Sequence, residues 1–240
     1  GVTGDKKYFR AAEKAWNDIV EKRLYITGSA TSAGYFIGDY SLPPDSTYWP
    51  NETCVTSNWL MFNQEMFMAT GNSKYVDQIE ITLYNQLPGS FNPQNGGIAF
   101  FCPLRYRKPY QKALSCCNTN LQRAFSRVPE LVWFKYTDNG LGIQLYTESK
   151  LQGKINTLNG EEINIECTIE TDYPKTGNIV ITLNPEKEAV FRLALRVPEW
   201  SRAFNVQARG IFFGSPGKFL YLDNNWFPGD KIIITVDMHD

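Results

Sequence analysis

The chain has 240 residues, which is enough to bury a full hydrophobic core and allows one large domain or two small ones. Its 24 basic and 25 acidic side chains nearly cancel, so no electrostatic footprint for nucleic acid or an anionic membrane is visible, and a neutral substrate fits better. No apolar run approaches the roughly 20 residues needed to span a bilayer. We therefore expect neither a nucleic-acid partner nor a membrane partner.

Apolar residues recur at helical spacing in the first part of the chain. A segment over residues 25–51, rich in Gly, Ser, Pro and Tyr, interrupts this pattern, and irregular segments of such length are usually functional or mobile. Gly71 is expected to end one helix, Ser73 to cap the next, and Pro129 to end the last. The expected helices cover residues 5–24, 52–70, 73–88 and 116–129, with a short strand over residues 98–104.

Beyond Pro129 the apolar period changes from 3.6 to 2, which predicts strands. Turn residues separate these strands at regular intervals, a pattern typical of an antiparallel β-sandwich. We therefore predict an α+β chain of two domains, with a helical part over residues 1–129 and a β-sandwich over residues 130–240. The expected strands cover residues 131–136, 141–147, 162–170, 178–183, 190–197, 204–208, 219–222 and 231–236.

Two adjacent cysteines stand at an expected helix start, in the stretch S-C-C-N-T-N-L over residues 115–121. A bent backbone just before the helix would let Cys116 and Cys117 approach one ion, and the electropositive helix end favours thiolate over thiol. Upstream, the stretch N-E-T-C supplies Glu52 and Cys54. One carboxylate and three sulfurs form a four-ligand set that suits zinc.

Other interpretations of the cysteines stay open. Free cysteines are commonly small core residues, although adjacency makes this less apt for Cys116 and Cys117. A thiol redox protein with a vicinal disulfide is a remoter interpretation, because the C-x-x-C spacing is missing. Five cysteines is an odd number, which argues against a secreted disulfide framework, and we expect Cys102 and Cys167 to be buried thiols.

Eight stretches, in order across nearly the whole chain, resemble the bacterial β-L-arabinofuranosidase family, glycoside hydrolase family 127, and its close relatives. The stretches are Y-I-T-G-S from Tyr25, D-Y-S-L-P-P-D from Asp39, Y-W-P-N-E-T-C from Tyr48, L-Y-N from Leu83, S-C-C-N-T-N-L from Ser115, L-Y-T-E-S from Leu145, R-V-P-E-W from Arg196 and W-F-P-G-D-K-I from Trp226. The resemblance implies the C-terminal part of an (α/α)6 barrel followed by a β-sandwich. Because family members are much longer, it also implies a fragment of a larger gene product.

The resemblance places the family's zinc ligands on Glu52, Cys54, Cys116 and Cys117, and its nucleophile on Cys116. It implies a retaining glycoside hydrolase that acts on L-arabinofuranose or a related sugar, with zinc as cofactor and a plant-derived oligosaccharide or glycan as partner. Retaining glycosidases usually use two carboxyl groups, one of them as nucleophile. Here a zinc-bound thiolate would replace that carboxylate, and water would then release the sugar from the sulfur.

The family's acid/base glutamate corresponds to Gly34 in this sequence. Asp39 is the expected replacement, with Asp45 as an alternative, although an aspartate in such a loop is more often a turn or cap residue. A second interpretation is therefore a catalytically impaired carbohydrate-binding or structural relative that keeps a zinc site for stability. The intact ligand set favours the hydrolase, and the missing glutamate favours the impaired relative.

Tyr48 and Trp49 either stack on a sugar or pack in the core, and His239 belongs to a solvated tail. Part of a helical barrel would expose a broad apolar wall, so we expect the isolated chain to form homo-oligomers or to be poorly soluble. Bacterial cytoplasm and periplasm remain equally open as its compartment.

Overall fold

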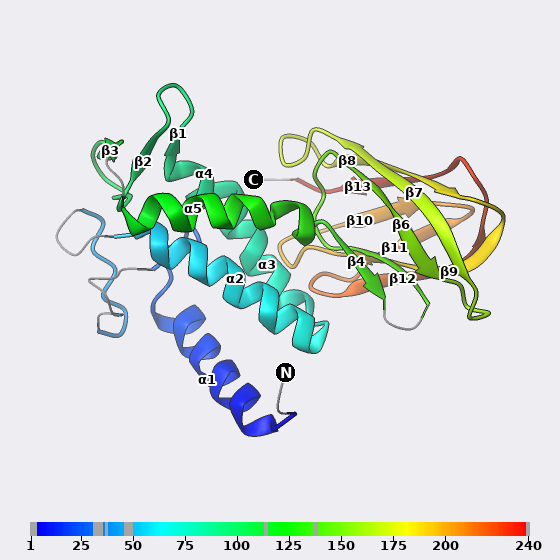
Figure 1. The fold of residues 1–240 in the computed structure, drawn as a ribbon, viewed down its shortest axis with the longest axis horizontal. Coiled ribbons are helices and arrows are strands. Elements are labelled where there is room, and N and C mark those ends of the chain that lie inside the picture. Colours follow the sequence, from blue (N-terminus) through cyan, green and yellow to red (C-terminus); the bar gives the residue numbers. More distant parts are fainter. Residues whose placement is uncertain are drawn as a thin grey trace. The chain divides into compact units, whose positions relative to one another are not determined.

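The computed structural model describes residues 4–30, 36, 38–45, 50–112, 115–136 and 139–238. The chain divides into two compact units, the first formed by residues 1–71 and 78–127 and the second by residues 72–77 and 128–240. Helices dominate the first unit and β-sheets the second (Figure 1), which confirms the predicted fold class. None of the described helices is long and apolar enough to cross a membrane.

All four predicted helices appear among the described residues. The first begins at Asp5, whose carboxylate accepts a hydrogen bond of 2.9 Å from the backbone N–H of Lys7. The second ends at Gly71, which adopts a φ of 68° and closes the helix in the left-handed conformation that glycine tolerates best. Their bounds are α1 Lys6–Lys22, α2 Thr53–Thr70, α3 Ser73–Ile81 and α5 Cys116–Arg127.

The third predicted helix contains a change of hydrogen-bonding pattern. After α3 the backbone forms a π-helical turn at Thr82–Gln86 and then the short helix α4 at Leu87–Gly89. The turn lies where the backbone of Gly28 approaches Thr82, whose hydroxyl donates to the carbonyl of Gly28 at 2.8 Å. A Cβ at Gly28 would lie 2.8 Å from the Thr82 nitrogen, so this contact requires glycine.

Helix α2 forms the core of the first unit. It packs against α5 (Figure 1), and its Trp59 stacks on Trp16 of α1 with ring centroids 6.2 Å apart. The indole N–H of Trp16 donates to the buried Asn63 of α2 at 2.6 Å. Three short strands, β1 Phe91–Asn92, β2 Gly97–Ala99 and β3 Tyr110–Gln111, complete this unit.

The strand predicted over residues 98–104 is shorter than expected. Only β2, ending at Ala99, lies in the three-stranded sheet. Phe101 instead forms an isolated bridge with Glu52, and the backbone N–H of the next residue, Cys102, donates to the carbonyl of Pro50 at 2.9 Å. The chain therefore leaves the sheet in order to pair with the segment that precedes α2.

Two sheets make up the second unit. One has six strands in the order β11-β10-β13-β8-β7-β6, and the other has four in the order β12-β9-β5-β4. Inward residues alternate with exposed ones along β7, as expected for a sheet with one buried face. The bounds are β4 Trp133–Tyr136, β5 Gly140–Ile143, β6 Ser149–Asn156, β7 Glu162–Thr171, β8 Asn178–Pro185, β9 Ala189–Arg196, β10 Phe204–Gln207, β11 Ile211–Phe213, β12 Phe219–Trp226 and β13 Asp230–Val236.

One strand pair departs from the antiparallel pattern. Strands β5 and β9 run parallel, with Leu141 opposite Leu193. The three intervening strands, β6, β7 and β8, belong to the other sheet, so the chain returns to the four-stranded sheet in its original direction. All other pairs in the two sheets are antiparallel.

A buried ion pair anchors residues 72–77 within the second unit. The guanidinium of Arg196, which is fully buried, donates to the carboxylate of Asp77 at 2.6 Å and to the carbonyl of Gln144 at 2.6 Å. The hydroxyl of Tyr146 donates to the carbonyl of Arg196 at 2.5 Å. These bonds therefore tie the first turn of α3 to strands of the same unit.

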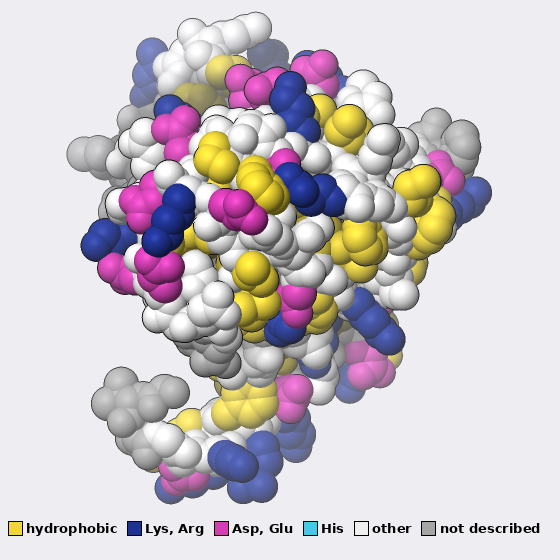
Figure 2. Space-filling model, turned by 90° about the vertical axis from the view of Figure 1, so that its right-hand side faces the viewer, with side chains coloured by type: hydrophobic (Ala, Val, Ile, Leu, Met, Phe, Trp, Pro, Cys, Tyr) yellow, Lys and Arg dark blue, Asp and Glu magenta, His cyan; other side chains and the backbone are white. Residues whose placement is uncertain are grey.

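Charged side chains of both signs are interspersed on the face of the molecule drawn in Figure 2. Hydrophobic side chains lie singly or in small groups between them. On this face no patch of a single charge dominates, in line with the nearly balanced charge of the sequence.

Candidate metal centre

Three sulfur atoms come together in the first unit. Cys54 lies in the first turn of α2, and Cys116 and Cys117 open α5. The three Sγ atoms lie within 4.8 Å of one another, and those of Cys54 and Cys117 are 3.2 Å apart. Residues 63 positions apart in the sequence thus form one thiol cluster.

The first turns of α2 and α5 place these sulfurs. Helix α2 begins at Thr53, whose backbone N–H donates to the carbonyl of Phe100 at 3.0 Å and whose hydroxyl donates to the carbonyl of Ala99 at 2.6 Å. Helix α5 follows Ser115, whose carbonyl accepts from the backbone N–H of Asn118 at 3.1 Å. Because α2 and α5 pack together, their first turns bring the cysteines to one place.

The side chain of Asn51 holds the backbone immediately before Glu52 in place, a role that the sequence did not reveal. Its backbone has a φ of 52° and its side chain is fully buried. The side-chain oxygen accepts from the hydroxyl of Thr27 at 2.9 Å, and the amide nitrogen donates to the carbonyl of Cys102 at 3.0 Å. The available sequence signal was the residue type, since asparagine tolerates the left-handed region and carries both a donor and an acceptor.

The three thiols differ in their surroundings. Cys117 is buried, Cys54 is half-buried and Cys116 is exposed. Burial raises the pKa of the Cys117 thiol, and it also raises the pKa of Cys54, against the opposing effect of a hydrogen bond from Asn120. A bound cation would therefore be needed to hold these two sulfurs as thiolates near neutral pH.

The predicted fourth ligand is near in sequence but outside this cluster. Glu52 is buried and precedes α2 in an extended conformation, with φ −61° and ψ 131°. The group gathered within 4.8 Å contains the three sulfurs and no carboxylate. Three cysteine sulfurs with a buried carboxylate two residues from one of them fit the donor preferences of zinc, so Glu52 stays a predicted ligand.

The predicted proton donor is engaged elsewhere. The carboxylate of Asp39 lies 2.8 Å from the guanidinium of Arg23 and 3.2 Å from the ammonium of Lys22, at the end of α1. The structure does not place it in the sulfur cluster. The predictions for Gly34, Tyr48, Trp49 and His239 fall outside the described residues.

The two remaining cysteines are buried, as predicted. Cys102 lies beside Ser90, with the Oγ and Sγ atoms 3.7 Å apart, and Cys167 lies on the inner face of β7. Burial raises the pKa of both thiols. Neither belongs to the cluster, so both are expected to be unreactive in the folded chain.

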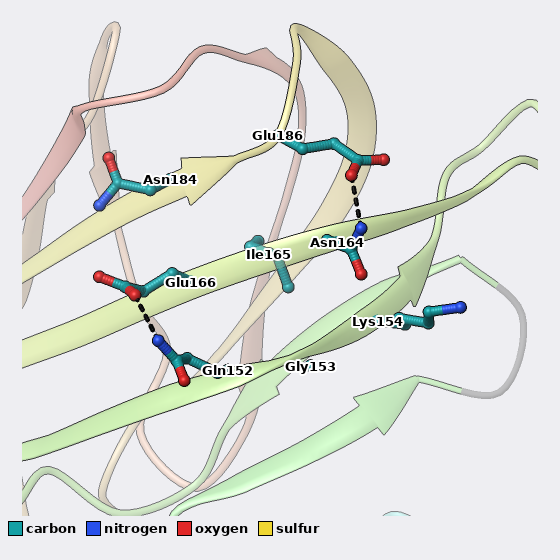
Figure 3. A pocket seen from close by; sticks show the side chains of 8 residues that line it. All are labelled: Gln152, Gly153, Lys154, Asn164, Ile165, Glu166, Asn184 and Glu186. Carbon is teal, nitrogen blue, oxygen red and sulfur yellow. Dashed lines mark hydrogen bonds between the residues drawn. The ribbon is translucent and has the colours of Figure 1, made fainter.

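A hollow of about 480 Å³ lies in the second unit, on strands β6, β7 and β8. Figure 3 shows amides and carboxylates paired across these strands, with Gln152 donating to Glu166 at 2.7 Å and Asn164 to Glu186 at 2.5 Å. The hollow is lined by no cysteine. It is therefore separate from the thiol cluster, which lies in the first unit.

A helical unit with a three-thiol cluster, joined to a β-sandwich, defines a two-part protein with a candidate metal–thiolate centre. Residues 1–130 match the family model described as the GH127 catalytic domain of β-L-arabinofuranosidase, and residues 140–238 match the GH127 middle domain. The chain belongs to glycoside hydrolase family 127.

Relatives agree with this assignment. Over 269 aligned residues the chain is 25% identical to a non-reducing end β-L-arabinofuranosidase of Bifidobacterium longum subsp. longum, covering 99% of this chain and 38% of the relative. A crystal structure of a GH127 β-L-arabinofuranosidase from Geobacillus stearothermophilus T6 superposes with a TM-score of 0.84 at 26% identity, over 98% of this chain and 39% of that one. A solved GH127 β-arabinofuranosidase gives a TM-score of 0.84 at 25% identity, over 98% and 40%. The chain thus spans about two fifths of these relatives.

Proposed function

We propose that the protein is a retaining glycoside hydrolase that cleaves β-L-arabinofuranosides or related sugars of plant-derived glycans with a cysteine nucleophile in a zinc site. The observation that carries this proposal is the gathering of Cys54, Cys116 and Cys117 within 4.8 Å, in the domain that matches the family's catalytic model. The substrate class rests on the family and on the activities of the relatives.

The exposure of the three cysteines indicates different roles for them. Zinc, when bound, would supply the positive charge that keeps the thiols ionised. Cys54, Cys116 and Cys117 would be three of the ligands, with Glu52 as the fourth, and the less accessible Cys54 and Cys117 would serve as ligands alone. Cys116 is exposed and would attack the anomeric carbon, forming a carbon–sulfur bond while the glycosidic carbon–oxygen bond breaks. A water molecule would then displace the sulfur from the anomeric carbon, and the two successive inversions would give net retention of configuration.

A proton must reach the leaving oxygen in the first step and leave the attacking water in the second. Asp39 is the proposed carrier, with Asp45 as an alternative. The two ion pairs of Asp39 with Lys22 and Arg23 would have to open for it to serve. This engagement, together with Gly34 at the usual glutamate position, favours as second candidate a catalytically impaired carbohydrate-binding or structural relative that retains the metal.

The first experiment measures zinc by elemental analysis in the purified chain and in Cys117→Ser. We expect stoichiometric zinc in the chain and its loss in the variant. Cys167→Ala is the matched control, because this buried thiol lies outside the cluster and its removal should leave zinc unchanged. Zinc-free, folded wild-type protein after refolding with added zinc would contradict the thiolate mechanism.

A second experiment separates the two candidate functions. Full-length protein carrying Cys116→Ser or Asp39→Asn is assayed on a synthetic β-L-arabinofuranoside. For the hydrolase we expect Cys116→Ser to lose at least ~10³-fold in rate, as is usual when a covalent nucleophile is removed. An inactive wild-type protein that still binds zinc would support the impaired relative.

A further inference from the structure

Asn120 directs its side-chain amide at one sulfur of the cluster. The residue lies on α5, one turn beyond Cys116, and its Nδ2 donates to the Sγ of Cys54 at 3.2 Å. The contact thus joins the side chains of α2 and α5 at the point where the two helices start. Neither the family comparisons nor the ligand set predicted from the sequence gives Asn120 a role.

Two other asparagines close to the cluster make different contacts. The amide of Asn58 on α2 donates to the backbone carbonyl of Cys54 at 2.8 Å, as an ordinary bond to the preceding turn. The side chain of Asn118 on α5 accepts from the hydroxyl of Ser115 at 2.8 Å. Of these three side chains, the amide of Asn120 is the one that reaches a sulfur.

We propose that Asn120 is a positioning residue that makes Cys54 a non-reacting ligand of the proposed zinc site and leaves Cys116 as the reactive sulfur. This inference rests on the proposed function. An N–H bond to a metal-bound thiolate orients the ligand and withdraws charge from the sulfur, which makes that sulfur a poorer nucleophile. Cys116 is the most exposed of the three cysteines, so its greater accessibility and the lowered nucleophilicity of Cys54 would both make the Sγ of Cys116 the reactive atom.

The test replaces zinc by cobalt(II), whose sulfur-to-metal charge-transfer absorption reports how strongly each thiolate donates. The variants are Asn120→Ala and Asn120→Leu, the second keeping the bulk of the side chain without its N–H. Asn58→Ala is the matched control, because its amide meets the backbone of Cys54 and not the sulfur. Circular dichroism confirms that each variant is folded.

We expect wild type and Asn58→Ala to bind stoichiometric cobalt with the same absorption band. Both Asn120 variants should bind with about 10- to 100-fold weaker affinity, as for lost partners of other metal ligands, and with the band moved to lower energy. A variant that merely loosened the fold would weaken binding without moving the band. Bands and affinities identical to those of wild type in both Asn120 variants would overturn the inference and leave the metal site standing.

A second readout follows the sulfurs themselves. The metal-loaded proteins are treated with limiting iodoacetamide, and the alkylated cysteines are identified by peptide mass spectrometry. We expect alkylation at Cys116 in wild type, and at both Cys116 and Cys54 in Asn120→Leu. Alkylation confined to Cys116 in that variant would overturn the inference. Wild type that binds no cobalt would overturn the proposed function together with it, so the two failures are distinguishable.

Discussion

The buried side chain of Asn51 holds the backbone that leads into the candidate metal centre. Its two hydrogen bonds, to Thr27 and to the carbonyl of Cys102, stabilise a left-handed backbone that a non-glycine residue adopts at a cost. In Asn51→Ala the carbonyl of Cys102 would lose its amide donor in a buried setting. We expect a loss of about 1–3 kcal/mol in the free energy of unfolding, measured by urea denaturation.

The control for this prediction is Asn58→Ala on the exposed side of α2. Its effect should stay within about 0.5 kcal/mol, as for most surface substitutions. Equal effects of the two substitutions would show that the bonds of Asn51 contribute little.

Glu52 offers a direct test of the fourth ligand. Glu52→Gln keeps the shape of the side chain and removes its charge. If the carboxylate binds zinc, the zinc affinity should fall while the three sulfurs retain some binding; we expect a decrease of at least ~10-fold in a competition titration with a chromophoric chelator. If the carboxylate of Glu52 only interacts with the positive N-terminal end of α2, the variant should lose about 0.3–1 kcal/mol of stability with unchanged zinc affinity.

At the residue scale, the sequence revealed the sulfurs and missed the amides. The adjacent cysteines and the Glu-x-Cys pair are conspicuous, because few structural roles demand two neighbouring thiols at a helix start. Asn51 and Asn120 could not be assigned, because an asparagine gains its role from the tertiary partner that its amide meets. The position of Glu52 outside the group of three sulfurs also depends on backbone geometry that spacing does not fix.

At the scale of elements, periodicity located most of the strands and missed the two edge strands of the six-stranded sheet. Strand β6 lies at one edge of the six-stranded sheet and buries only one of its eight residues, while β11 lies at the other edge and buries none. Their apolar alternation is therefore weak. The parallel pairing of β5 with β9 was also missed, because pairing depends on where the three intervening strands go.

Two glycines in strands of the second unit have different surroundings, so we expect substitution by alanine to change stability differently at each. The ring of Phe134 on β4 covers Gly142 on β5, so a Cβ there would lie 1.9 Å from the ring. Phe134 also meets Phe219 edge to face, with centroids 5.6 Å apart, so a shift of its ring would disturb this contact. We expect Gly142→Ala to destabilise the protein by about 1–3 kcal/mol in urea unfolding.

The matched control is Gly153→Ala on β6. Nothing lies within 4 Å of a Cβ built there, so the substitution should be neutral or stabilise by up to about 1 kcal/mol. If both alanines behaved alike, the contact of Phe134 with Gly142 would not limit the packing of this sheet.

At the scale of the whole molecule, the sequence motifs identified the family, and its catalytic and middle domains match residues 1–130 and 140–238 in the predicted order of the two parts. The motifs could not show which apolar side chains are exposed on the surface. Several large apolar side chains of the first unit are exposed, including Ile26 at 89% and Met68 at 69%. We expect the isolated chain to associate, giving a mass above 27.4 kDa in light scattering that rises with concentration.

Substitution of exposed apolar residues can identify the surface through which the chains associate. Ile26→Lys and Met68→Lys should lower the scattering mass toward that of the monomer. Ile211→Lys is the control, because Ile211 is 72% exposed but lies on β11 in the second unit. A monodisperse monomer at every concentration would refute the prediction.

Metal removal should act on the stability of the folded chain as a whole. A ligand that binds the folded state alone adds about 2.7 kcal/mol to the free energy of unfolding at one hundred times its dissociation constant. For a chain of this length that corresponds to about 5–10 °C in melting temperature. We expect excess zinc to raise the melting temperature of the wild-type chain by this amount, and a chelator to reverse the change.

The size of that stabilisation should depend on pH. Burial raises the pKa of the Cys54 and Cys117 thiols, and zinc must displace their protons in order to bind. Proton competition weakens as pH rises, so the zinc-dependent shift in melting temperature should be larger in mildly alkaline than in mildly acidic buffer. Cys117→Ser, scanned by calorimetry under the same conditions, should show no zinc-dependent shift at either pH. An equal shift in this variant would place the stabilising metal outside the thiol cluster.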